Sequence, residues 1–246
     1  MSKIKQGVIF MIQATMELLF DAAYLTFALF IGIYLIAKGK GKFFKLFGVM
    51  AVVLSSGDSF HLIPRVYALF TTGLEANAFA LGLGKLITSI TMTLFYVIFY
   101  FILESVRKPN KIKTISCRIC LFFLAALRIV LCAFPQNKWF SYEGSLLWGI
   151  LRNIPFALIG TEIIVICFLI AKTCKDRSYY IMALMVILSF GFCIPVVLFS
   201  DTVPIIGVLM IPKTLAYVGI VIIGLIKHRA QTKKIQIDRA EKGCYN

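Results

Sequence analysis

The chain has 246 residues, of which 60% are hydrophobic and only 15% are charged. A soluble domain keeps about a quarter of its residues charged, so the composition excludes an ordinary soluble domain and predicts a protein that lies largely in lipid. The formal net charge of +15 would indicate nucleic-acid binding in a soluble protein, but here the basic residues fall between apolar runs and no nucleic-acid-binding motif accompanies them.

Seven apolar runs follow one another along the chain. A bilayer core about 30 Å thick takes roughly 20 apolar residues per helix, and each run is close to that length or longer. The sequence therefore predicts an all-α integral membrane protein, a bundle of seven transmembrane helices, and Pro64 is expected to end the second of them. The runs cover approximately residues 14–37, 43–65, 78–104, 115–135, 144–171, 178–200 and 203–226.

The two ends of the chain differ from the apolar runs. Lys3 and Lys5 resemble the start of a signal peptide, but Glu17 and Asp21 interrupt the apolar stretch and no small-residue cleavage site follows it. We therefore expect residues 1–13 to be a short N-terminal, interfacial segment, residues 14–226 to be the transmembrane domain, and residues 227–246 to be a basic cytoplasmic tail.

The distribution of Lys and Arg predicts the orientation of the bundle. The connections at 38–45, 107–118 and 172–177 and the tail from Lys227 together hold eighteen of these residues, whereas the other side has four: Lys3, Lys5, Arg65 and Lys138. Cytoplasmic loops carry the excess of Lys and Arg. We therefore expect the N-terminus outside and the C-terminus in the cytoplasm. The composition is rich in Lys, Ile and Phe, which favours a low-GC bacterium and hence the bacterial inner membrane, that is, a plasma-membrane location.

Ionisable side chains lie within six of the seven runs, mostly at outer or middle depth. A charge at the bilayer centre costs about 2.5–3.5 kcal/mol, so we expect these side chains to share an interior cavity. Asp58, His61 and Arg65 recur at i, i+3 and i+7, which is one face of a helix. The candidate ligand-binding or ion-pathway residues are Asp21, Asp58, His61, Lys85, Arg128, Arg152, Asn153, Glu162 and Lys213, with Glu17 and Arg65 nearer the rim.

The sequence gives little support for a metal or cofactor site. A catalytic zinc site needs three protein ligands, and the chain has only His61 and His228, so seven-helix hydrolases of the alkaline ceramidase type are disfavoured. Lys213 resembles the Schiff-base lysine of retinal proteins, but Leu209 stands where the microbial proteins carry Asp. We expect neither a metal nor a cofactor.

Three functions remain open. The first is binding or transport of a small polar solute, anionic or zwitterionic because bases slightly outnumber acids within the runs, in a cavity that opens outward. The second is an intramembrane enzyme that acts on a lipid or lipid-linked substrate, with His61 and Asp58 as an acid–base pair. The third is a non-catalytic receptor or assembly partner in which the charges form interhelical salt bridges. A void beside unpaired charges would favour the first two.

Overall fold

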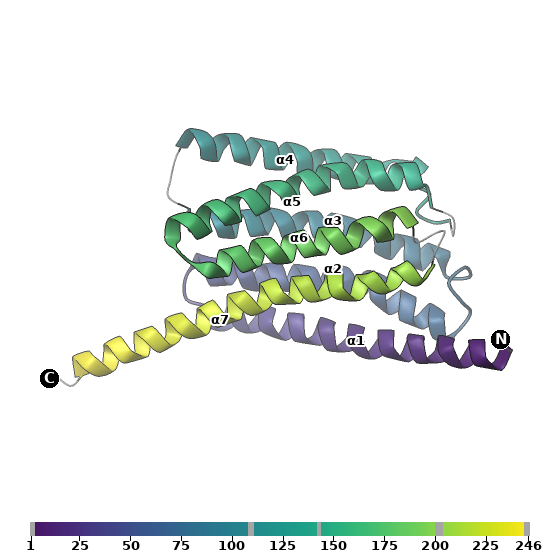
Figure 1. Ribbon diagram of the computed structural model, residues 1–246, viewed down its shortest axis with the longest axis horizontal. Helices are drawn as coiled ribbons and strands as arrows, with labels where there is room; N and C mark the ends of the chain where they lie inside the picture. Colours follow the sequence, from purple (N-terminus) through teal and green to yellow (C-terminus); the bar gives the residue numbers. More distant parts are fainter. Residues whose placement is uncertain (1–2, 108–110, 142–143, 200–203, 244–246) are drawn as a thin grey trace.

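A computed structural model of the chain describes residues 3–107, 111–141, 144–199 and 204–243 (Figure 1). All regular structure in these ranges is helical. Seven helices are long and apolar enough to cross a membrane, which confirms the expected number by length and composition. They are α1 (Lys3–Lys38), α2 (Lys42–Phe70), α3 (Ala78–Glu104), α4 (Lys111–Ala133), α5 (Leu146–Cys174), α6 (Arg177–Phe199) and α7 (Met210–Gly243), with the short 3-10 helices η1 (Pro135–Asn137) and η2 (Pro204–Leu209).

The end of α2 corrects one expectation from the sequence. Pro64 lies inside the helix, which continues to Phe70. The turn after Phe70 is closed by Gly73 instead, since this glycine has a positive φ of 87° and its N–H donates to the carbonyl of Ala68 at 3.0 Å. A glycine in this conformation is a common helix terminator. The connection to α3 is therefore shorter than the proline predicts.

The start of α7 also differs from its apolar run. The α-helix begins at Met210, after η2. Pro212 has no N–H to donate to the carbonyl four residues earlier, and it lies in the first turn of α7, where no such hydrogen bond is needed. At the other end α7 continues through residue 227 to Gly243, and α1 is likewise continuous across residue 13. The described parts of the two flanking segments, residues 3–13 and 227–243, are thus helical extensions of the first and last helices.

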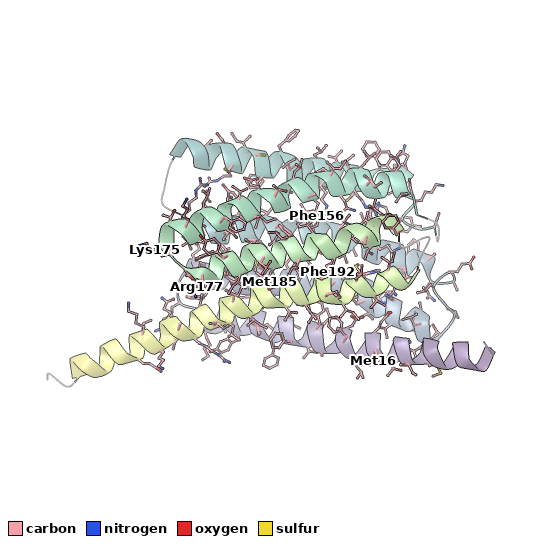
Figure 2. The ribbon with its side chains drawn as sticks, viewed as in Figure 1. Met16, Phe156, Lys175, Arg177, Met185 and Phe192 are labelled. Carbon is pink, nitrogen blue, oxygen red and sulfur yellow. The ribbon has the colours of Figure 1, made fainter. Side chains whose placement is uncertain are left out.

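The helices form one closed bundle. Each helix packs against the next one in the chain, and α7 also contacts α1 and α2. In Figure 1 the ends of α2, α4 and α6 and the starts of α3, α5 and α7 lie at the end where α1 begins, which we call the N-terminal end. The opposite, C-terminal end carries the basic Lys175 and Arg177, far from Met16 on α1 (Figure 2).

The outer surface of the bundle is apolar. Phe30, Ile119, Phe123 and Leu147 are each more than 60% exposed, which a protein in water would avoid over so wide an area. The interior is built around aromatic residues of α3, among them Phe95, Tyr96 and Phe99, which are fully buried. Lipid is the solvent that fits this surface.

Glycines let α2 and α3 approach closely beside the site. A Cβ on Gly84 would overlap the backbone of Phe60 and His61, and a Cβ on Gly57 would overlap the side chain of Thr91. Small residues allow such close backbone contact between membrane helices. The contact at Gly84 fixes the position of His61.

Candidate functional site

Two cavities lie between the helices toward the N-terminal end of the bundle. The first, of about 260 Å³, we call the basic chamber because five cationic side chains line it and none of its described lining residues is acidic. The second, of about 220 Å³, we call the acidic chamber because Glu17, Asp21 and Asp58 line it. The cations of the basic chamber come from α3, α4, the α4–α5 connection, α5 and α7: Lys85, Arg128, Lys138, Arg152 and Lys213.

The two chambers share a wall. His61, Lys85 and Lys213 line both of them, together with Thr88 and Met92 of α3. The side chain of Lys213 thus borders the carboxylates of one chamber and the arginines of the other. Among the described residues no carboxylate oxygen comes within 4.0 Å of its ammonium group, so Lys213 forms no ion pair with them.

Arg128 is the most deeply buried cation of the basic chamber. Its side chain is held by α4, and the residue is only 4% exposed. The guanidinium carbon lies 3.5 Å from the centre of the Phe156 ring on α5, so the cation stacks on an aromatic face. Its Nε and Nη1 atoms are buried without a hydrogen-bond partner among the described residues. Two donors of a buried charge are therefore left without an acceptor.

Arg152 is held in place by the connection between α4 and α5. Its Nη1 donates to Oδ1 of Asn137 at 2.7 Å, and its guanidinium carbon lies 4.2 Å from the ring centre of Trp139. Asn137 is itself fixed, because its Nδ2 donates to the carbonyls of Leu131 and Phe134 at the end of α4. One asparagine thus caps α4 and orients an arginine of the basic chamber.

The acidic chamber is partly neutralised from within. Arg65 and Glu17 form an ion pair with Nε and Oε2 3.0 Å apart, and the Tyr24 hydroxyl donates to Oδ2 of Asp58 at 2.7 Å. Asp21 is 9% exposed. Asp58, His61 and Arg65, which recur on one face of α2, all line this chamber.

Eight of the nine candidate residues from the sequence line one or both chambers. Asn153 lines the basic chamber, although its Nδ2 donates to the Gly149 carbonyl within its own helix. The structure places Glu162 outside both chambers, further along α5 toward the C-terminal end.

Sequence reasoning missed several residues that shape the site, among them Lys138, a cation of the basic chamber. Asn137 and Trp139 sit in the polar connection after α4, and Phe156 is an apolar residue among many. Polar residues are concentrated from Gln136 to Trp139, between two apolar runs. This concentration is the one sequence feature that could have indicated Asn137 and Trp139. Phe156 becomes recognisable only when Arg128 is seen stacked on it.

Comparison with protein-family models, with curated proteins and with solved structures finds no match to this chain. Its function must therefore be inferred from the chambers themselves. Among the described residues, no three His, Cys, Asp or Glu side chains are grouped as metal ligands would be. Cationic hydrogen-bond donors that converge on a void are the feature with a clear chemical consequence, because such donors bind carboxylate and phosphate oxygens.

Proposed function

We propose that the protein binds a small anionic or zwitterionic solute in the basic chamber, and that this chamber opens to the outer face of the plasma membrane. The observation that carries the proposal is Arg128, a buried guanidinium with two donors that lack partners and face a lined void. Removing an ion from water costs several kcal/mol. An anion in the chamber would offset that cost by accepting the free N–H groups.

A purely structural role for the charges fits less well. Structural charges in a membrane interior are expected in pairs, as Glu17 and Arg65 are. Arg128 and Arg152 have no carboxylate within 4.0 Å among the described residues. Cations that are held apart from acids and directed at a cavity favour a ligand over a bridge between helices.

The enzyme hypothesis has weaker support. A carboxylate that orients a catalytic histidine ordinarily accepts a hydrogen bond from its ring. No hydrogen bond between His61 and Asp58 appears among the described side chains; Asp58 instead accepts from Tyr24. We therefore favour binding over hydrolysis.

Transport would need a second opening. At the inner wall of the chambers, aromatic rings of α3, α5 and α7 pack together, with ring centres 5.4 Å apart for Phe95 and Tyr217 and 5.0 Å apart for Tyr96 and Phe156. This aromatic layer separates the chambers from the C-terminal end. In a transport cycle, the described arrangement corresponds to the state open toward the N-terminal end.

Trp139 provides a direct test, because it lines the basic chamber and the chain has only one other tryptophan. In a Trp148→Phe variant we expect iodide, an anion, to quench the Trp139 fluorescence far more strongly than caesium, and phosphate to compete with iodide. Arg128→Gln should weaken this quenching several-fold. Arg118→Gln, a matched change in an exposed ion pair with Glu104, should leave it unchanged. Equal quenching by iodide and caesium, or by iodide in the two arginine variants, would refute the proposal.

A further inference from the structure

A narrow apolar groove lies between α5 and α6, and its volume is about 200 Å³. On α5 it is formed by Ile150, Asn153, Ile154 and Ala157, which are spaced i, i+3, i+4 and i+7 and so share one helical face. The matching face of α6 runs from Phe190 to Leu198. From residue 150 to 157 the groove extends ~10 Å along the helix axis.

The groove is continuous with the basic chamber. Asn153, Phe156, Cys193 and Val197 line both of them. Phe156 is the central residue of this junction, because its ring carries the Arg128 guanidinium and also forms a wall of the apolar groove. A molecule that spans the junction would therefore meet cations at one end and hydrocarbon at the other.

The groove is bordered by Phe190 and open on its outer side. The Phe190 ring packs against Gly160 of α5, where an added Cβ would overlap it. Ile154 and Ile194 form the outer rim and are 50% and 55% exposed. Since lipid surrounds this surface, the open side faces hydrocarbon.

We infer that the anion bound by the basic chamber is the head of a single-chain amphiphile, a long-chain phosphate or carboxylate, and that its chain lies in the α5–α6 groove. This inference rests on the proposed function and names its ligand class. The head supplies the acceptors that Arg128 and Arg152 require. The hydrocarbon chain of the ligand exchanges contacts with lipid for contacts with the groove at little cost in free energy, because lipid tails are as apolar as the groove residues. Ligand sites for small molecules measure about 300–1,000 Å³; the groove, at about 200 Å³, is smaller, so it has room for part of one chain and none for a second.

Photo-crosslinking in nanodiscs of phosphatidylcholine tests the inference. The probe is dodecyl phosphate with a diazirine in its chain, and a dodecyl trimethylammonium with the same diazirine is the control for charge. We expect the phosphate probe to label groove residues, Ile154 and Ile194 among them, at least several-fold more than the cationic probe. Ala157→Phe, which fills the groove, should remove this labelling. Ala126→Phe, the same change at an exposed site of α4 outside the groove, should keep it.

The two proposals can fail separately. If iodide and phosphate still bind beside Trp139 but the phosphate probe labels all apolar faces equally, the chamber binds a small soluble anion and the inference is wrong. If the Ala157→Phe protein is labelled as strongly as the unchanged protein, the hydrocarbon chain of the ligand does not occupy the groove and the inference is also wrong. If neither phosphate nor the probe binds, the proposed function fails as well.

Discussion

The guanidinium carbon of Arg128 lies 3.5 Å from the centre of the Phe156 ring. A cation–π contact of this kind contributes about 0.5–2 kcal/mol, whereas burying the ion costs several kcal/mol. The ring therefore offsets only part of the cost. The difference is the free energy that an anion in the basic chamber can recover.

Close packing at Gly84 holds His61 in the wall between the chambers. Ala in a helix is ordinarily about 0.5–1 kcal/mol more favourable than Gly, but a Cβ on Gly84 would overlap backbone atoms of Phe60 and His61 that cannot move aside. We expect Gly84→Ala to destabilise the protein by about 1–3 kcal/mol, as overpacking does. Gly191→Ala is the control, because nothing lies within 4 Å of its added Cβ. Thermal unfolding in detergent should give shifts of opposite sign, and similar shifts would contradict the close contact.

Asp176, between α5 and α6, should make stability depend on pH on the acid side. Burial favours its neutral form, but hydrogen bonds from Lys227 and Ser178 outweigh that effect, so its pKa lies below the ordinary 3.8. A carboxyl with a lowered pKa stabilises the folded state above its unfolded pKa, and this stabilisation is lost as the pH falls through the folded pKa.

We therefore expect the thermal midpoint of the wild-type protein to fall more steeply below about pH 4 than that of Asp176→Asn. All other titratable groups are the same in the two proteins. The difference between their pH profiles therefore reports the contribution of the Asp176 carboxyl alone. Parallel pH profiles would show that the hydrogen bond between Lys227 and Asp176 does not form in the membrane protein.

The orientation of the bundle can be tested at its C-terminus. Because α7 ends at the opposite end from the chambers, a cytoplasmic C-terminus requires chambers that open outward. A green fluorescent protein fused after Asn246 should fluoresce, since it folds in the cytoplasm, while an alkaline phosphatase fused there should be inactive. An active phosphatase would invert the bundle and place both chambers on the cytoplasmic side.

The helices and most chamber residues could be predicted from the sequence for a single physical reason. Hydrocarbon penalises charge, so ionisable residues such as Asp58, Arg128 and Lys213 in apolar runs are expected to point inward. The same rule holds for Glu162 and cannot tell which cavity a charge joins. At ten residues beyond Arg152, Glu162 lies ~15 Å further along α5, and the structure places it away from the chambers.

The separation into two chambers and a groove could not be predicted. It depends on which helices meet, and the contacts that decide it join distant parts of the chain, such as Arg152 with Asn137 and Gly84 with Phe60. Nor does an apolar pattern distinguish Phe156, which supports a cation, from its neighbours on α5. These features belong to tertiary packing.

Thermal unfolding of the Arg128→Met protein beside the wild type, as potassium phosphate replaces potassium gluconate at constant ionic strength, tests anion binding by the basic chamber most directly. We expect the variant to unfold at a higher temperature than the wild type without phosphate, because a buried charge without a partner has been removed, and not to respond to phosphate. The wild-type midpoint should rise with phosphate, as it does when a ligand binds only the folded state. A variant that unfolds at a lower temperature, with neither protein responding to phosphate, would show that Arg128 holds the helices together and that the chamber binds no anion.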